Sequence, residues 1–204
     1  MSRSRDLGAA IAQAVAALRA GELVIYPTET FYGIAADPES PAALEKIFAA
    51  KGREPGKPIA LIAADTAAAF SLAADVSPLA DRLAAAFWPG PLTIVLPARA
   101  GLHAALVGPG GVGVRVSSHP VAQALAAGFG RPFTATIANL SGAPAVADPR
   151  LLAPRLSDQI KVVLEDGTLP GGTASTVVEV TGGALKIIRA GAIDEASIRK
   201  AAHE

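Results

Sequence analysis

The chain has 204 residues, enough for one well-buried domain, and 51% of them are hydrophobic, which excludes a disordered chain. Its 18 basic and 18 acidic residues balance, so the net charge gives no general support for nucleic-acid or membrane-surface binding, and any anion site must be local. The absence of cysteine excludes disulfides, thiolate metal sites and cysteine nucleophiles. No apolar run reaches membrane length and the start lacks a signal-peptide core, so we expect a soluble, cytoplasmic protein.

The N-terminal half predicts helices alternating with short buried strands. An apolar stripe of helical spacing covers residues 7–20 and stops at Gly21. Ser40 is expected to cap a helix that ends near Lys51, where the helix dipole favours a cation, and Ser77 is expected to cap the next helix. Strands are expected over residues 23–26, 59–63 and 93–96.

The C-terminal half continues this alternation. His119, Asp148 and Asp194 each stand at the expected start of a helix. Gly182 and Gly183 are typical of the turn of a β-hairpin. Strands are expected over residues 113–116, 133–137, 161–164, 176–180 and 185–188. Strands mixed with helices predict an α/β fold, and the hairpin excludes a purely parallel sheet.

The stretch 26–58 contains the most informative polar residues. A buried strand ends at Tyr26 and runs into a threonine-containing turn, and Lys51, Arg53 and Lys57 follow on a proline-stiffened loop. The helix between the two segments would return the cations to the side of the threonines. Hydroxyls facing a guanidinium and two ammonium groups suit an anionic ligand, most plausibly one that carries phosphate.

Other motifs are misleading. Residues 108–113 match G-x-G-x-x-G, but a proline lies inside the match and a strand follows, so we predict a loop and no dinucleotide site. Residues 52–57 resemble a P-loop with one spacer too few, and Pro58 stands where Ser or Thr should bind magnesium. The histidines match no metal-ligand spacing, so no protein metal site is expected, and His119 is best explained as a cap.

Eight short stretches occur in one order along nearly the whole chain. They are Y-P-T-E-T-F-Y-G (26–33), K-x-R (51–53), W-P-G-P-L-T (88–93), V-G-V-R (112–115), H-P (119–120), A-N-L-S-G (138–142), S-T-V-V (175–178) and I-I-R-A-G (187–191). In content and order they resemble the threonylcarbamoyl-AMP synthase family. The resemblance implies one YrdC-like domain over residues 1–204, built on a twisted, open, mixed β-sheet with flanking helices.

The resemblance also implies an activity. Members of this nucleotidyltransferase family convert L-threonine, bicarbonate and ATP to L-threonylcarbamoyl-AMP and pyrophosphate, for the N6-threonylcarbamoyladenosine (t6A37) modification of tRNA. The implied partners are these three substrates, Mg²⁺ accompanying ATP, tRNA or double-stranded RNA, and a downstream tRNA threonylcarbamoyl transferase complex. Crowding a carboxylate, a carbamate and a triphosphate together requires clustered cations, which fits Lys51 and Arg53 as the catalytic pair.

Each family role transfers to a matching position. Thr30, Arg115 and Ser175 resemble the threonine-binding groups, with Arg115 facing the substrate carboxylate. The residues that resemble the nucleotide-binding groups are Lys51, Arg53, Lys57, Asn139 and Arg189.

Three positions depart from the family pattern: Ile137, Ala145 and Thr168. Ile137 stands where the family usually has a serine, and isoleucine cannot donate a hydrogen bond to phosphate. Two alternatives therefore stay open beside the synthase: a non-catalytic module that binds double-stranded RNA or tRNA, and a divergent paralogue that makes another carbamoyl-adenylate.

Overall fold

The computed structural model describes residues 2–52 and 56–203. Within them, ten strands form one sheet in the order β10-β9-β4-β6-β3-β7-β2-β1-β8, with β5 paired to β6 beside this path. The pairs β1–β8, β3–β6 and β4–β9 are parallel and β9–β10 is an antiparallel hairpin, which confirms the expected α/β fold with a mixed sheet. The strands are β1 (Leu23–Tyr26), β2 (Gly33–Ala35), β3 (Ala60–Ile62), β4 (Leu92–Leu96), β5 (Val107–Gly108), β6 (Gly111–Arg115), β7 (Phe133–Ile137), β8 (Ile160–Val163), β9 (Thr176–Thr181) and β10 (Ala184–Arg189).

The helices begin where the sequence places capping residues. The side chains of Ser40, Ser77 and Asp194 each accept the amide N–H three residues ahead, at 3.2, 3.3 and 2.8 Å, and His119 caps through Nδ1 as expected. The helical segments are α1 (Ser2–Arg19), α2 (Pro41–Lys51), α3 (Thr66–Phe70), α4 (Pro78–Phe87), α5 (Pro120–Phe129), α6 (Pro154–Ser157), α7 (Glu195–His203) and the 3-10 turns η1 (Ala104–Leu106) and η2 (Pro149–Leu151).

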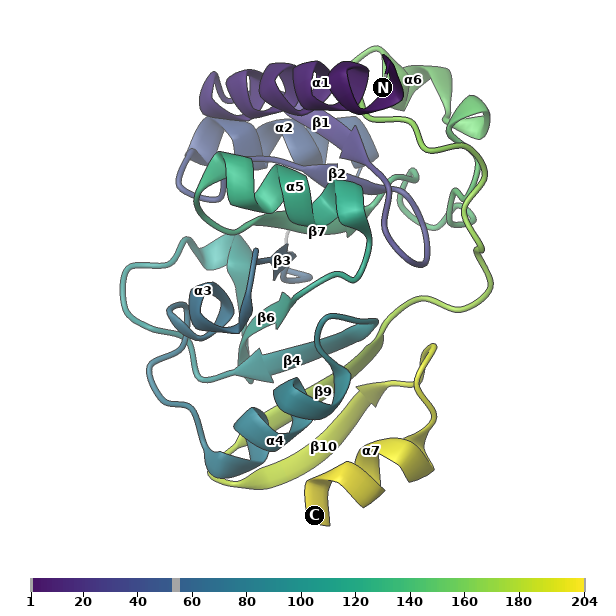
Figure 1. Ribbon diagram of the computed structural model, residues 1–204. Coiled ribbons are helices and arrows are strands. Elements are labelled where there is room, and N and C mark those ends of the chain that lie inside the picture. Colours follow the sequence, from purple (N-terminus) through teal and green to yellow (C-terminus); the bar gives the residue numbers. More distant parts are fainter. Residues whose placement is uncertain (1, 53–55, 204) are drawn as a thin grey trace.

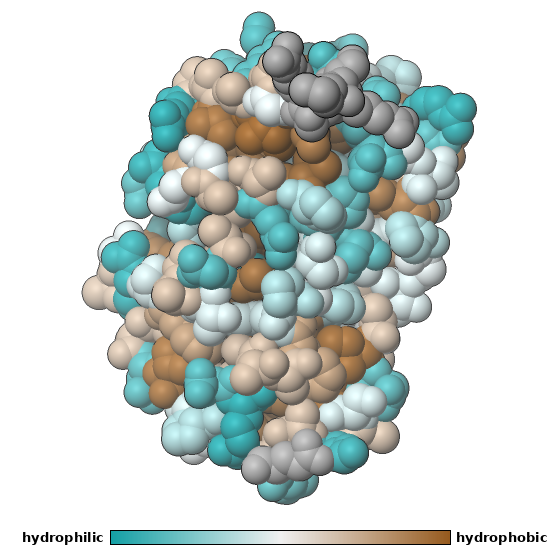
Figure 2. Space-filling view, in the orientation of Figure 1, coloured by the Kyte–Doolittle hydropathy of each residue, from teal (hydrophilic) through white to brown (hydrophobic). Residues whose placement is uncertain are grey.

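The sheet buries its two faces against different helices. Side-chain alternation sends Leu23 and Ile25 of β1 into the larger core with α2, α4 and α7, and sends Val24 and Tyr26 into a second core with α1 and α5. Figure 1 shows α1 and α5 side by side over one half of the sheet, with α4 and α7 beside the other half. Hydrophilic and hydrophobic residues are interspersed over the face in Figure 2, in keeping with the balanced charge.

The face that carries α1 and α5 continues past the strands these helices cover. On β3 and β7, Ala60 and Ala135 lie on this continuation, while Leu61 and Thr134 point away from it. On β6, Gly113 and Arg115 also lie on this continuation, whereas Val114 points into the larger core on the opposite face. The continuation is therefore available as a binding surface.

Four details differ from the sequence-based expectation. Strand β2 and helix α3 were not predicted, because three and five residues are too short to show a period. The helix expected after Asp148 is only the 3-10 turn η2, since the chain turns again at Pro154 to begin α6. Residues 108–113 are not an open loop; they form the tight β5–β6 hairpin, with no helix following the glycines.

Candidate active site

A cavity of about 650 Å³ lies on the continuation of the α1/α5 face, a size typical of small-molecule sites. Its floor is built from small residues on three adjacent strands, among them Ala60, Gly113 and Ala135. A Cβ atom added to Gly113 would stand 3.4 Å from both Ala60 and Thr93, so a larger residue there would fill the floor. Small side chains thus keep this part of the sheet open.

The turn between β1 and β2 forms one wall. The hydroxyl of Thr28 accepts the backbone N–H groups of Thr30 and Phe31, both at 3.2 Å, which closes the turn and buries Thr30 beside the cavity. Gly33 is required at the start of β2, because a Cβ atom there would fall 2.7 Å from the ring of Tyr26. Burial of that ring raises the pKa of the Tyr26 hydroxyl, so it stays protonated at neutral pH.

Arg115 lies at the end of β6, where it meets the same turn. Its Nη1 donates to Oε1 of Glu29 at 3.2 Å, and the other oxygen of Glu29 accepts the hydroxyl of Ser117. The side chains of Arg115 and Glu29 are 8% and 15% exposed, so solvent screens this ion pair only weakly. The guanidinium is therefore held in one orientation at the edge of the cavity.

Ser175 and Arg189 form the neighbouring wall. Arg189 donates through Nη2 to the carbonyl and the hydroxyl of Ser175, at 2.8 and 3.1 Å, and that hydroxyl lies 3.1 Å from the hydroxyl of Thr93. Partial burial of the guanidinium lowers the pKa of Arg189, and the positive charge of Arg115 lowers it further. Arg189, predicted on the nucleotide side, thus contacts a residue predicted on the threonine side.

Lys51 faces the loop that follows β7. Its buried ammonium group donates to the carbonyl oxygens of Ile137 and Asn139, at 2.5 and 2.7 Å, and to Oδ1 of Asn139 at 2.9 Å. The amide group of Asn139 donates in turn to the carbonyl of Ala143 at 2.6 Å. Lys51 therefore orients the Asn139 loop through three hydrogen bonds. This loop and Ile137 border the cavity.

The glycine-rich segment 164–175 ends at the cavity, which its last two residues, Ala174 and Ser175, line. It runs along one side of the molecule from β8 to β9 in Figure 1. The Tyr32 hydroxyl donates to the carbonyl of Gly167 at 2.7 Å and accepts the N–H of Asp166 at 3.0 Å, while Nε2 of His119 lies 3.3 Å from Asp166. Burial lowers the pKa of His119, although the negative charges of Asp166 and Glu29 partly oppose that shift.

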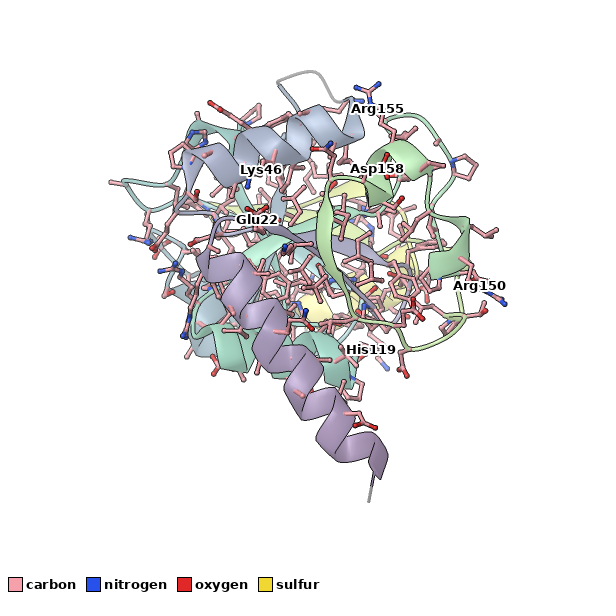
Figure 3. All side chains as sticks on the ribbon, turned by 90° about the horizontal axis from the view of Figure 1, so that it is seen from above. Glu22, Lys46, His119, Arg150, Arg155 and Asp158 are labelled. Atoms are coloured by element: carbon pink, nitrogen blue, oxygen red, sulfur yellow. The ribbon has the colours of Figure 1, made fainter. Side chains whose placement is uncertain are left out.

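The structure brings together the predicted site residues that it describes. They all border the cavity: Thr30, Lys51, Lys57, Arg115, Asn139, Ser175 and Arg189. Arg53 lies outside the described residues. Figure 3 shows Arg150 and Arg155 pointing outward from the ribbon, and the cavity lining does not include them.

Sequence reasoning missed one polar side chain that lines the cavity, Thr93, and two that lie behind Arg115, Glu29 and Ser117. Glu29, Thr93 and Ser117 were not predicted, although Glu29 and Thr93 fall inside two of the quoted motifs. Glu29 was not predicted because a carboxylate has the wrong charge to bind an anionic ligand. Its partner, Arg115, is distant in sequence and is revealed only by the fold. Among the described residues, no group of three His, Cys, Asp or Glu could hold a metal ion.

The fold and the site define an α/β protein with a partly apolar cavity bordered by cations and hydroxyls, which suits a small anionic ligand. Within the described part of the chain, no helix has the length and apolar character needed to cross a membrane. The family model Sua5/YciO/YrdC, described as "Telomere recombination", matches residues 16–191. The chain belongs to this family.

Its relatives are similar over most of the chain. The threonylcarbamoyl-AMP synthase of Vibrio cholerae is 41% identical over 76% of this chain and 85% of its own length. The enzyme of the same name from Bacillus subtilis is 35% identical over 92% of this chain and 55% of its own length. The crystal structure of P. abyssi Sua5 complexed with L-threonine superposes with a TM-score of 0.88 at 33% identity, over 94% of this chain and 56% of that one. The chain thus spans about half the length of the Bacillus and Pyrococcus relatives.

Proposed function

We propose that this protein is an L-threonylcarbamoyladenylate synthase, which forms threonylcarbamoyl-AMP and pyrophosphate from L-threonine, bicarbonate and ATP. The observation that carries the proposal is the convergence of Thr30, Arg115 and Ser175 with Lys51 and Asn139 around one cavity, although they come from distant segments. Relatives named threonylcarbamoyl-AMP synthase, and a related structure that holds L-threonine, support the same activity.

The proposed roles divide the cavity into two sides. Thr30, Arg115 and Ser175 bind threonine, with the remaining N–H groups of Arg115 directed at its carboxylate. The proposed nucleotide-binding residues at the cavity are Lys51, Lys57, Asn139 and Arg189, and the family motif assigns Arg53 to the same role. Lys51 acts chiefly by fixing Asn139, because its ammonium group already donates to three oxygens of that loop.

The proposed chemistry needs placement more than covalent catalysis. The deprotonated amine of threonine attacks the carbon of bicarbonate or its dehydrated form and gives a carbamate, with loss of water overall. A carbamate oxygen then attacks the α-phosphorus of ATP, and the bond to the β,γ-pyrophosphate breaks. Cations that are already oriented stabilise the charge that develops on the phosphoryl oxygens and hold the reactants in line.

Magnesium enters this scheme with the nucleotide. The cavity lining contains Glu179, while Glu29 already pairs with Arg115 and Ser117, so these residues do not assemble a magnesium cage. Mg²⁺ characteristically keeps several waters and binds through substrate phosphates. We therefore infer that it is bound to the triphosphate and supplies charge neutralisation there.

The wider setting follows from this activity. We infer one YrdC-like domain that works in the cytoplasm and passes its product to a tRNA threonylcarbamoyl transferase complex, with tRNA as the final acceptor. The mixed anhydride of a carbamate and AMP is an activated donor, so its consumer must carry out transfer to an amine. A direct contact with tRNA or double-stranded RNA would be made outside the cavity.

The test is pyrophosphate release from ATP, measured with L-threonine and bicarbonate each present or omitted. We expect release only when both are present, and formation of threonylcarbamoyl-AMP by mass spectrometry. The Vibrio cholerae relative run in parallel controls for the assay. Folded protein that releases no pyrophosphate while the relative is active would refute the proposal, and salt-dependent tRNA binding without ATP binding would favour the RNA-binding alternative.

A further inference from the structure

Glu29 is an acidic residue that contacts Arg115 beside the threonine side of the cavity, without itself lining the cavity. It lies in the turn between two buried threonines, and its side chain is 15% exposed. Each carboxylate oxygen has its own partner: one accepts Nη1 of Arg115 at 3.2 Å, and the other accepts the hydroxyl of Ser117. Two such contacts fix a carboxylate more firmly than one, since neither oxygen can rotate away without losing a bond.

The contacts of Glu29 join two parts of the molecule that are far apart in sequence. Ser117 Oγ also accepts the backbone N–H of His119 at 3.2 Å, so the carboxylate connects the β1–β2 turn to the segment that enters α5. Arg115 lies between these parts at the end of β6. The position of its guanidinium is therefore set from the turn side of the cavity by Glu29.

Charge explains why a carboxylate is present at an anion site. Arg115 and Arg189 are close enough for the charge of Arg115 to disfavour protonation of Arg189. Without a counter-charge this repulsion would displace the Arg115 side chain, whereas Arg189 keeps its own hydrogen bonds to Ser175. Glu29 occupies one edge of Arg115, leaving the guanidinium's other N–H groups to meet a ligand carboxylate.

We propose that Glu29 is a positioning residue for amino-acid recognition: it holds Arg115 in the orientation that binds the α-carboxylate of the substrate. This inference rests on the proposed function for the identity of the amino acid. It assigns to Glu29 an effect on threonine affinity that acts through Arg115, with little effect on the nucleotide side of the cavity.

The experiment compares Glu29→Gln with wild type by calorimetric titration with L-threonine and, separately, with ATP. Glutamine keeps the shape of the side chain and removes its negative charge: its oxygen can still accept Arg115 and its amide N–H can donate to the Ser117 hydroxyl, but the bond to Arg115 is no longer charge-assisted on both sides. Weakening the bond that orients the guanidinium predicts a roughly tenfold weaker threonine affinity. ATP affinity should change by less than about twofold, because substitutions at sites without shared contacts couple only weakly. Glu39→Gln is the matched control, because Glu39 also pairs with an arginine, but Glu39 is exposed and its partner Arg131 does not border the cavity.

A second measurement separates positioning from a merely structural role. If Glu29 acts through Arg115, Glu29→Gln should reduce kcat/KM for threonine about tenfold in wild type and less than twofold in an Arg115→Lys background. Should Glu29→Gln fail to fold in thermal unfolding, Ser117→Ala removes one contact of the same carboxylate and should weaken threonine binding about threefold. Three outcomes would each overturn the inference: effects of the two substitutions on kcat/KM that multiply in the double variant, equal weakening of threonine binding and ATP binding, or unchanged threonine affinity. Wild-type protein that does not bind threonine would refute the proposed function instead.

Discussion

Replacing Lys51 by methionine tests whether this residue fixes the nucleotide side of the cavity. The substitution keeps the length and the apolar stem of the side chain but removes its charge and its three donated hydrogen bonds to Ile137 and Asn139. Lys51 is 4% exposed, so the oxygens it leaves behind are not fully open to water. The Asn139 loop should lose its main support.

The expected loss of stability follows from these contacts. A hydrogen bond from a charged donor contributes about 1.5–3 kcal/mol, which sets an upper bound of roughly 5–9 kcal/mol for three. Lysine also gives up hydration when it is buried, and methionine recovers about 1 kcal/mol through its apolar contacts. Water can reach the partly exposed Asn139 oxygens in the variant. We expect a net loss of about 2–4 kcal/mol, or a Tm lower by roughly 5–10 °C for a chain of this size.

Urea unfolding and thermal unfolding measure the stability change, and the pyrophosphate assay measures the KM for ATP. ATP KM should rise about tenfold, because a freed Asn139 must be ordered again on binding, and threonine affinity should change less. Lys46→Met is the matched control on the same helix: Lys46 bonds Glu22 and the Gly21 carbonyl, but its side chain is 39% exposed and its loss should cost less than about 1 kcal/mol. Equal effects of the two substitutions would refute the assigned role of Lys51.

Three further predictions concern single positions. Ile137→Ser should raise kcat/KM for ATP about tenfold if the isoleucine only removes a hydrogen bond to phosphate; no gain, or a loss of folding, would show that the cavity is packed around Ile137. Gly191→Ala should destabilise by about 3 kcal/mol or more in urea unfolding, because its Cβ would fall 2.4 Å from the backbone at Ser175, whereas Gly8→Ala, with open space around it, should not destabilise. Burial lowers the pKa of His119, so the folded state prefers the neutral ring. The stability that the neutral ring contributes is therefore present above the pKa of the unfolded chain, near 6.5, and is lost as the pH falls through the lower pKa of the folded state. Urea unfolding at several pH values should show this loss in wild type and a smaller one in His119→Asn, which keeps a capping oxygen; an equal slope in both proteins would contradict it.

Local chemistry made much of the fold predictable. Ser40, Ser77 and Asp194 were expected as caps because their side chains can accept a backbone N–H, and each one does so. The glycine pair at 182–183 predicted the β9–β10 hairpin, which the register confirms. The order of strands across the sheet was not predictable, because pairs such as β4–β9 depend on packing between distant segments.

The candidate site was predictable in its members but not in its contacts. Family motifs supplied the positions of Arg115 and Ser175, and the structure places both at one cavity. The motifs could not show that Arg115 pairs with Glu29, or that Arg189 bonds Ser175, because neither pair is close in sequence. Lys51 had a sufficient local explanation at the end of its helix, and its contact with the Asn139 loop appears only once β7 is in place.

Three cations of the cavity, Arg115, Arg189 and Lys51, share one property that bears on catalysis. Arg115 is held by Glu29, Arg189 by Ser175 and Lys51 by the Asn139 loop, so each has an internal partner before any substrate arrives. Cations fixed in this way lose little side-chain freedom on binding, and they can stabilise transferring charge without reorganising. The same arrangement makes the site depend on these partners, so removing a neutral or acidic neighbour should also impair anion binding. The balanced net charge of the chain therefore does not argue against an anion site, because the positive groups act through orientation rather than through excess charge.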